Sequence, residues 1–440
     1  MQLLTAALRR ELTRLLPDRP FHVHFWDGTI VPATSVNAPV FDVRAPSAVA
    51  HVLRTPGRLG LGRAYVEGSL DADDLDAAFR VIDSWTAPRI ALTDRVRLVG
   101  AAAAAGVSAG VFHRPALELV LRGGRHTVER DAAAVRYHYD AGNDFFALFL
   151  DQSMTYSCAL FSKGARTLEQ AQQAKLELVA AKLGLKAGQR VLDVGCGWGS
   201  FAVHAARQHG VSVLGVTLSE SQADLARRRV ADAGVADRVE IRVADYREVC
   251  ERPFDAISSI GMVEHVGEIR IDEYARTLAS LLQPGGLLLN HGIAALRADD
   301  NASGDPFTNR YVFPDAEPLY LSRVQLAFER AGLITEHIEG FASDYSVTLD
   351  HWAQRLDERL EDARRLAGAE RTRVWRLYLR AARLGFDTGY TAVYQVVARR
   401  PRCARRDARR VGDTPTTSQA RPPLTSASMT HQDGSSCQRR

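Results

Sequence analysis

Cysteines are few in this sequence, and none is paired at the spacing of a metal site or a redox motif. The 440 residues include five cysteines, which are scattered, odd in number and never arranged as CxxC. Neither a disulfide framework nor a zinc site is indicated, and no metal is expected. The five are Cys158, Cys196, Cys250, Cys403 and Cys437.

Long apolar runs are missing as well. Residues 98–112 are apolar, but they span only about 15 residues, are rich in Ala and are too short to cross a bilayer. Residues 1–16 are amphipathic and punctuated by Arg, without the apolar core of a signal peptide. We therefore expect a cytoplasmic protein.

Lysine is scarce, so Arg supplies almost all of the positive charge. Lys occurs only at positions 163, 175, 182 and 186, and the net charge is +4. Residues 399–440 carry ten Arg against three Asp, which leaves the preceding chain slightly acidic. This distribution argues against a nucleic-acid-binding protein. The basic tail, 401–440, is rich in Arg, Ser, Thr and Pro and is expected to be disordered.

The glycine-rich stretch 190–200 carries the strongest functional signal. A short apolar run predicts a buried strand, and Gly195, Gly197 and Gly199 follow it before an amphipathic helix. A strand, a glycine turn and a helix N-terminus form a nucleotide-binding corner, because glycine lets the backbone approach a ligand closely. The GxGxG spacing and the preceding Asp193 favour S-adenosylmethionine (SAM) over a dinucleotide. An ordinary tight turn is the alternative.

Strand and helix patterns alternate from residue 190 onward. Repeated βα units imply an α/β, Rossmann-like fold with a mostly parallel, seven-stranded sheet and helices on both faces. The expected strands are 190–194, 212–216, 238–243, 254–260, 286–291, 334–340 and 392–398. The expected helices are 200–208, 220–233, 271–282, 321–331, 349–366 and 371–384.

Four parts of the chain are expected. They are a small N-terminal α/β domain at 1–90, a connector at 91–130, the main domain at 131–400 and the tail at 401–440. Within the first part, Ser47 is the expected N-cap of a helix that ends at Arg54. The stretch Gly57–Gly62 is expected to form a glycine-rich loop.

Polar residues follow the second and third strands of the main domain. Thr217 and Gln222 are placed to bind a ribose, since this loop lies beside the first glycine turn. Alternatively, Ser219 and Gln222 form a capping box with no ligand role. Tyr246 and Arg247 are placed to meet an adenine ring, and a plain acidic turn is the alternative there.

Two titratable residues follow the next two strands. Glu264 and His291 are delivered to the same sheet edge, where active sites gather such groups. A lone His at a strand end is more often structural, but the pair favours function. A metal would need a third ligand; His265 is in sequence range, but it is expected to point away.

Several motifs appear in one order along the chain. They are Tyr139-Asp140-Ala141-Gly142-Asn143-Asp144-Phe145-Phe146, Met154-Thr155-Tyr156-Ser157-Cys158, the 191–199 turn, Thr217–Gln222, Glu264-His265-Val266-Gly267, Arg310-Tyr311-Val312-Phe313-Pro314 and Asp344-Tyr345. Together they closely resemble the cyclopropane-fatty-acyl-phospholipid synthase family, which includes the mycolic acid cyclopropane synthases. The resemblance covers about 131–398 and implies a class I SAM-methyltransferase domain. The sequence departs from many members at Ala382, where they have a cysteine.

The resemblance implies methyl transfer from SAM to the cis double bond of an acyl chain, usually in a phospholipid. The carbocation that forms would lose a proton to a bound bicarbonate, and a cyclopropane ring would close. The implied bicarbonate site comprises Glu264, His291, Tyr345 and the backbones of Cys158 and Ile293. The implied SAM contacts are Tyr156, Ser157, Gly195, Gly197, Thr217, Leu218, Gln222, Tyr246 and Arg247, with Asp193 and Gly199 completing the turn.

Other outcomes remain open at this point. Loss of a proton from another carbon would give a methylene- or methyl-branched chain, and a small-molecule O- or N-methyltransferase would explain fewer of the motifs. A catalytically silent lipid- or SAM-binding homologue is the alternative from another class. Acyl chains of membrane phospholipids are the expected partners. Peripheral contact with the inner face of the membrane and a homodimer are further expectations.

Overall fold

The computed structural model describes residues 4–86, 88–107, 115–119, 124, 127–139, 141–251, 253–296 and 305–402. Beyond residue 402 the basic tail, with its expected disorder, lies outside the described residues. So do residues 108–114, 120–123 and 125–126 of the expected connector.

A seven-stranded sheet forms the centre of the main domain, in the order β10-β11-β9-β8-β5-β6-β7. β5, β6, β7, β8 and β9 pair in parallel, whereas β11 pairs antiparallel with both β9 and β10. The strands are β5 (Arg190–Val194), β6 (Ser212–Thr217), β7 (Val239–Val243), β8 (Phe254–Ile260), β9 (Leu282–Ala295), β10 (Ile334–Gly340) and β11 (Thr391–Arg399). The expected α/β class and mostly parallel sheet are confirmed, and β9 is longer at both ends than expected.

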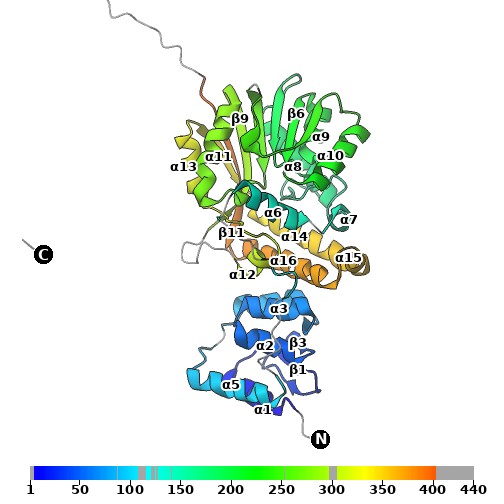
Figure 1. Ribbon diagram of the computed structural model, residues 1–440, viewed down its shortest axis with the longest axis vertical. Helices are drawn as coiled ribbons and strands as arrows, with labels where there is room; N and C mark the ends of the chain where they lie inside the picture. The colour runs from blue at the N-terminus through cyan, green and yellow to red at the C-terminus, as the bar shows by residue number, and fades with distance from the viewer. Residues whose placement is uncertain are drawn as a thin grey trace, which may run out of the picture. The chain divides into compact units, whose positions relative to one another are not determined.

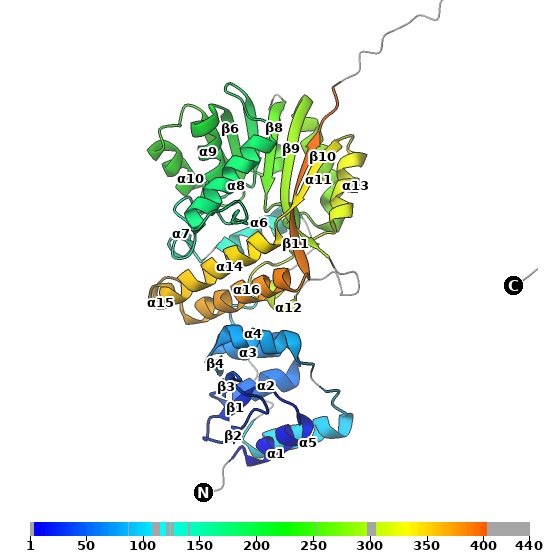
Figure 2. The ribbon, with the colours of Figure 1, turned by 180° about the vertical axis from the view of Figure 1, so that it is seen from behind.

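Helices cover both faces of this sheet (Figures 1 and 2). They are α8 (Leu168–Lys182), α9 (Ser200–His209), α10 (Glu220–Asp232), α11 (Gly267–Leu281) and α13 (Leu321–Arg330). Neighbouring residues of β5 serve opposite faces, as the two-residue period of a strand requires. Val191 packs in one core with Phe201 of α9, and Leu192 packs in another with Tyr274 of α11.

Three helices between β10 and β11 replace the two that the sequence predicted. α14 (Ala342–Glu358), α15 (Leu360–Ala367) and α16 (Ala369–Asp387) follow one another, with a break at Arg359. α14 begins earlier than expected because tertiary contacts override weak local propensity. There the Asp344 carboxylate accepts from the backbone of Phe161 and Ser162, and Thr348 donates back to the Asp344 carbonyl.

These helices pack over the glycine-turn end of the sheet. Trp352 of α14 and Trp375 of α16 share one buried core with Trp198 of the turn. The short helices α6 (Val128–Tyr139), α7 (Asn143–Phe146) and α12 (Pro306–Tyr311) also belong to this region, and Phe146 joins the same core. Figure 2 shows α14 and α16 beneath the sheet.

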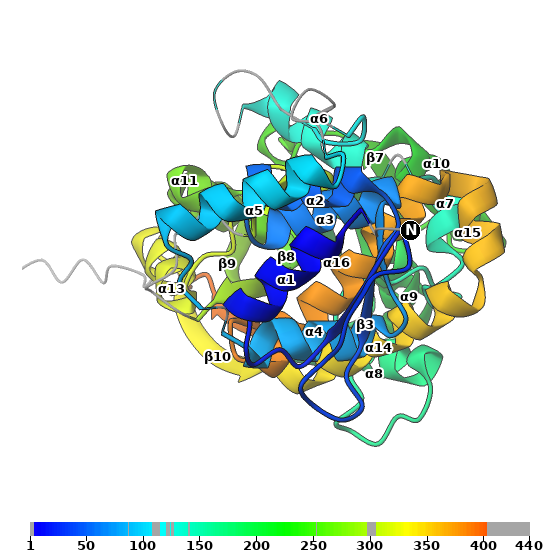
Figure 3. The ribbon, with the colours of Figure 1, turned by 90° about the horizontal axis from the view of Figure 1, so that it is seen from below.

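The N-terminal part builds its own four-stranded sheet, in the order β2-β1-β3-β4. Its elements are α1 (Ala6–Leu15), β1 (His22–Phe25), β2 (Ile30–Val31), β3 (Val40–Val43), α2 (Pro46–Arg54), α3 (Arg58–Glu67), β4 (Leu70–Ala72), α4 (Leu75–Ser84) and α5 (Leu92–Ala104). Figure 3 shows α5 beside α1. Ala101 and Ala102 of α5 share a core with Leu8 and Phe25, so this packing unit extends into the expected connector.

Two expectations for the N-terminal part are wrong. The N-cap of α2 is Ala45, and Pro46 rather than Ser47 opens the helix, since its fixed φ suits the first helical position. The expected loop Gly57–Gly62 lies mostly within α3. A Cβ on Gly60 would lie 2.1 Å from the Thr55 carbonyl oxygen, and one on Gly62 would lie 2.5 Å from Phe307. These two glycines therefore permit close packing of a helix.

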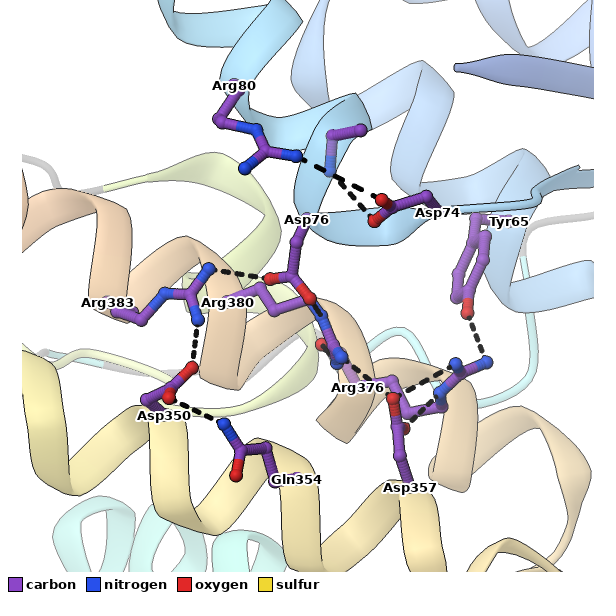
Figure 4. Close-up of polar contacts among 11 residues, drawn as sticks. Tyr65, Asp74, Asp76, Arg80, Asp350, Gln354, Asp357, Arg376, Arg380 and Arg383 are labelled. Carbon is purple, nitrogen blue, oxygen red and sulfur yellow. Dashed lines mark hydrogen bonds and ion pairs between the residues drawn. The ribbon is translucent and has the colours of Figure 1, made fainter. Parts of the chain in front are cut away.

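Arginines along α16 connect the N-terminal part to the main domain (Figure 4). Arg380 lies 3.2 Å from Asp76 and 2.7 Å from Asp357, so it pairs with a carboxylate on each side. Arg383 also pairs with Asp76, at 2.6 Å, and Arg376 donates to the Tyr65 hydroxyl at 3.1 Å. Because Arg380 is buried, its own charge-assisted bonds to the partly exposed Asp76 and Asp357 are partly shielded from solvent.

Candidate functional site

The glycine turn follows β5, whose neighbours on both sides are parallel strands. Gly195, Gly197 and Gly199 have φ values of 73°, 54° and 78°, a left-handed region that favours glycine. A Cβ on Gly197 would meet no protein atom within 4 Å, whereas one on Gly199 would lie 3.2 Å from the Ala226 Cβ. Gly197 thus leaves room for a ligand, and Gly199 permits close packing of α9 on α10.

A cavity opens at this turn, and every predicted cofactor-binding residue except Gly199 lines it. These residues are Tyr156, Ser157, Asp193, Gly195, Gly197, Thr217, Leu218, Gln222, Tyr246 and Arg247. They come from strand ends and loops that the sequence separates by up to 91 positions, and the sheet topology brings them together. The cavity therefore fits the predicted nucleotide pocket.

Buried charge lines one wall of the cavity. Burial raises the pKa of Asp193 to about 6, and the Ser258 hydroxyl donates to its carboxylate at 2.7 Å. Burial also lowers the pKa of Lys175 to about 8, and its Nζ donates to the Ser157 hydroxyl at 2.8 Å. The sequence analysis did not predict Lys175 as a residue of the cavity. The signal that could have indicated it was a charged residue on the otherwise apolar face of a helix.

The neighbouring residue on that helix face also supports the pocket. Gln172 of α8 is fully buried, and its Nε2 donates to the carbonyl oxygens of Thr155 and Ser157 at 3.2 and 2.9 Å. These bonds hold the segment that carries Tyr156. The helix α8 therefore holds this wall of the cavity in place through the buried side chains of Gln172 and Lys175.

The expected capping box at the start of α10 is incomplete, because the Ser219 backbone N–H donates to Thr217 Oγ1 rather than to Gln222. The ribose interpretation of this loop is compatible with the structure. Ser219 is the N-cap of α10 and accepts from the Gln222 backbone at 3.3 Å. Thr217 donates its hydroxyl to the Gln222 side-chain oxygen at 2.8 Å. The Gln222 Nε2 atom is buried without a hydrogen-bond partner, so it can donate to a ligand in the cavity.

Tyr246 and Arg247 lie in the short helix η1 (Tyr246–Glu248) after β7. The Arg247 guanidinium forms two bonds to the Asp245 carboxylate, at 2.8 and 2.7 Å. Such bidentate pairing fixes the plane of the guanidinium. Tyr246 is buried, and the Arg247 guanidinium lies 5.5 Å from the centre of its ring.

Glu264 does not line the cavity but lies behind it, in the short helix η2 (Val263–His265) after β8. Its Oε1 accepts from the Ile293 backbone N–H at 2.7 Å, so in this structure that N–H is given to Glu264. Its Oε2 is buried without a hydrogen-bond partner. Burial raises the pKa of Glu264 to about 7, which keeps much of the carboxyl protonated near neutral pH.

His291 lies on β9 level with the end of β8 and is also buried. Its Nδ1 lies 3.1 Å from Nε2 of Gln395, directly opposite on β11. Lys182 donates to the Gln395 oxygen at 2.7 Å, which turns the amide nitrogen toward His291. Nδ1 is therefore the acceptor, and the proton resides on Nε2, a buried donor without a partner.

Burial lowers the pKa of His291 to about 3, so the ring is neutral. Tyr345 of α14 interacts with Glu264 rather than with His291: burial raises the pKa of its hydroxyl, and the nearby Tyr378, Cys158 and Glu264 add to that rise. The structure thus gathers Glu264 and Tyr345 with the Cys158 backbone region. Gln395 was missed by the sequence analysis.

Aromatic rings pack together beside the cavity, and Tyr156, which lines the cavity, belongs to the same core as Phe313 and Tyr345. Tyr156 lies 5.2 Å from Trp352, measured between ring centres, and Trp352 lies 6.1 Å from Tyr345. Phe313 lies 5.5 Å from Tyr378. The Cys158 thiol is buried, donates to the Ala159 carbonyl and has a raised pKa because of burial, which makes it a poor nucleophile.

A glycine turn at the carboxyl end of a central parallel strand, with polar residues at the neighbouring strand ends, defines a SAM-dependent methyltransferase of the α/β class. A family model described as mycolic acid cyclopropane synthetase matches residues 126–396. The chain belongs to this family.

Individual relatives agree with this membership. A probable fatty acid methyltransferase of Mycobacterium tuberculosis is 39% identical over 81% of this chain and 86% of its own length. The cyclopropane-fatty-acyl-phospholipid synthase of Escherichia coli K12 is 35% identical over 71% of this chain and 75% of its own length. The solved structure of mycolic acid cyclopropane synthase CmaA1 complexed with SAH and CTAB has a TM-score of 0.58 and 33% identity, covering 61% of this chain and 98% of CmaA1.

In the portion of the chain that the structure describes, no helix is long and apolar enough to cross a bilayer.

Proposed function

We propose that this methyltransferase acts on the cis double bond of an unsaturated acyl chain in a phospholipid and forms a cyclopropane. The observation that carries the proposal is the buried aromatic core beside the glycine-turn cavity, which shares Tyr156 with the cavity and packs against Ile293, the backbone partner of Glu264. An alkene needs an activated methyl donor, which the sulfonium of SAM supplies. The relatives named as cyclopropane synthases support this substrate class.

The residues of the glycine-turn cavity would hold SAM. Gly197 leaves the space for it, Gln222 offers a buried unpaired donor, and Tyr246 offers an aromatic face. Tyr156 lines the cavity and also packs in the aromatic core, so it lies at the boundary between methyl donor and acyl chain. These residues would together place the methyl group of SAM toward the acyl chain.

Methyl addition to the alkene leaves a cation on the chain, and ring closure requires loss of a proton from the new methyl. The faces of Tyr156, Phe313 and Tyr345 would stabilise the cation without forming a bond to it. The buried core excludes water, which would otherwise trap the cation. The raised pKa of Cys158 keeps its sulfur a thiol, so it too would not react.

Bicarbonate would bind beside the buried Glu264 carboxyl. The Glu264 Oε2 and His291 Nε2 atoms are buried without partners, and a protonated Glu264 can donate to an anion. Together with Tyr345 and the Cys158 backbone they would hold it, while the Ile293 N–H, which donates to Glu264, would fix the carboxyl beside it. The bound anion would supply a base where the proton is lost.

A methyl-branched product is the second candidate. It shares the first step and differs in which carbon loses the proton, and a subsequent reduction would complete it. The M. tuberculosis relative named as a probable fatty acid methyltransferase favours it. The position of the base relative to the cation decides between the two.

Lipid analysis after expression in a host that makes unsaturated phospholipids tests the proposal. Mass spectrometry and NMR should show a 14-dalton gain with cyclopropane proton signals. A methylene or methyl branch would support the second candidate instead. Unchanged lipids, from a folded protein that binds SAM, would identify a catalytically silent homologue and refute both.

Access to phospholipid requires peripheral membrane contact, and α5 offers a surface for it at the inner face. Leu92, Val96 and Val99 are 77%, 66% and 55% exposed at helical spacing, and exposed Arg95 and Arg97 flank them. Such a row suits an anionic bilayer, since apolar side chains insert and Arg meets phosphate. Val96→Asp should reduce co-sedimentation with anionic vesicles and leave SAM binding intact; unchanged sedimentation would refute this contact.

A further inference from the structure

Three metal-ligating side chains meet on the outer side of α8 and α9, away from the glycine-turn cavity. Glu177 of α8 lies between His204 and His209 of α9. Its Oε2 is 3.2 Å from Nε2 of each histidine. The three donor atoms all lie within 4.8 Å of one another.

These separations are close to those within a metal coordination sphere. Four ligands at zinc–nitrogen and zinc–oxygen distances of about 2.1 Å lie about 3.4 Å from each other. Both Glu177–histidine separations are near that length already, so only the two histidines need to approach each other. His209 is the last residue of α9 and precedes Gly210, and this position at the helix end leaves its side chain room to turn.

The backbone behind the three ligands is firmly packed. Val179 and Ala180 of α8 are fully buried in one core with Ala202 and Ala205 of α9. Glu177 therefore reaches His204 and His209 from a fixed neighbouring helix. Ligands held on rigid elements lose little conformational freedom when they bind an ion.

A supporting contact orients the buried histidine. Nε2 of Gln173, one turn before Glu177 on α8, lies 3.2 Å from Nδ1 of His204. If the Gln173 amide turns by half a turn, its oxygen can accept a hydrogen bond from Nδ1–H of His204. In that tautomer of His204 the Nε2 atom carries no proton and is free to bind a metal. Metal-bound histidines usually have such a partner on the other ring nitrogen.

We propose that Glu177, His204 and His209 form a binding site for a borderline divalent transition metal of the zinc class. Two imidazoles and one carboxylate suit Zn²⁺, whereas Mg²⁺ and Ca²⁺ prefer oxygen ligands throughout. The Glu177 side chain is 54% exposed, which gives an ion access from solvent and leaves the fourth position to water.

The site ties together two helices that support the SAM pocket. α8 carries Lys175 and Gln172 on its other face, and α9 begins directly after the glycine turn. An ion at this position links α8 to α9 without touching the cavity. It is therefore a structural clamp, and methyl transfer itself does not require it.

Titration of the untagged, chelator-treated full chain with Zn²⁺ tests the site. One ion should bind, and Zn²⁺ but not Mg²⁺ should raise the unfolding temperature. His209→Asn and Glu177→Gln should each weaken binding at least tenfold. Co²⁺ should give the visible absorption of a tetrahedral site in the wild type but not in His209→Asn.

His337→Asn is the matched control, since His337 is exposed and also lies near a glutamate. This variant should bind Zn²⁺ as the wild type does. Metal-free His209→Asn should unfold at the wild-type temperature, which separates loss of a ligand from loss of the fold. Equal Zn²⁺ affinity in His209→Asn, Glu177→Gln and wild type would overturn the proposal, as would an ion held with octahedral Co²⁺ absorption.

Discussion

Replacing Glu264 by Gln should stabilise the protein at alkaline pH and have little effect at acid pH. Burial raises the pKa of Glu264 from 4.5 to about 7 in the folded state, while the backbone N–H of Ile293 partly opposes the shift. Below pH 4.5 the carboxyl is protonated in both the folded and the unfolded chain. Between pH 4.5 and about 7, the Glu264 carboxyl ionises in the unfolded chain but stays protonated in the folded chain. This difference favours unfolding.

The magnitude follows from the size of that shift. Each pH unit between 4.5 and 7 costs the folded wild type about 1.4 kcal/mol, and above pH 7 the loss levels off near about 3 kcal/mol. Gln has nearly the same shape and never ionises, and its oxygen can still accept from Ile293. The difference in unfolding free energy between Glu264→Gln and wild type should therefore grow with pH.

Urea unfolding between pH 5 and 8, in bicarbonate-free buffer, measures this difference. Glu118→Gln is the control of opposite sign, because Arg63 and Arg310 bond to Glu118 and lower its pKa despite burial. The folded-state pKa of Glu118 is depressed below 4.5, so the wild-type advantage over Glu118→Gln should stay constant from pH 8 to 5 and shrink only when the measurement is extended below pH 4.5. A Glu264→Gln difference that stays constant from pH 5 to 8 would refute the reasoning, since Glu264 would then titrate as it does in water.

Three further predictions concern the ligands and the tail. Gly197→Val should lower SAM affinity more than tenfold in equilibrium dialysis. Gly234 has a similar φ of 67°, and a Cβ there would meet no atom within 4 Å, so Gly234→Val should be equally strained yet bind SAM normally. Equal SAM affinities of Gly197→Val and Gly234→Val would refute the assigned pocket. Glu264→Ala should slow turnover on the order of 100-fold, and bicarbonate depletion should reversibly inhibit the wild type. An enzyme indifferent to bicarbonate but inactive as Glu264→Ala would make Glu264 itself the base. Truncation after Arg402 should leave turnover on detergent-dispersed lipid unchanged, and loss of that turnover would place the tail in the folded enzyme.

Signals that were contiguous in the chain predicted the glycine turn well. The strand, the three glycines and the following helix all lie within a few residues, so their pattern alone indicated the turn. The cap at Ser219 was likewise readable, because it bonds to Gln222 only three positions away. Alternation of strands and helices then placed Glu264 and His291 near one sheet edge.

Contacts between distant segments could not be read in the same way. Gln395 orients His291 across 104 positions, and no local periodicity indicates that β11 enters the sheet next to β9. The glycines of α3 were predicted to form a loop because a high density of glycine is typical of loops. In the structure Gly62 lies in a helix, and its lack of a side chain lets Phe307, which is distant in the sequence, pack against it. Lys175 was overlooked because its partner Ser157 lies in another element.

The placement of β11 has a consequence for synthesis of the protein. This strand is the last of the described strands to leave the ribosome, yet it occupies an interior position between β9 and β10. Until it arrives, one edge of β9, with the apolar Leu288 and Leu289, has no partner strand. Unpaired apolar edges promote association between nascent chains. A premature stop before Thr391 should therefore yield an aggregating chain rather than a dispersed, inactive enzyme.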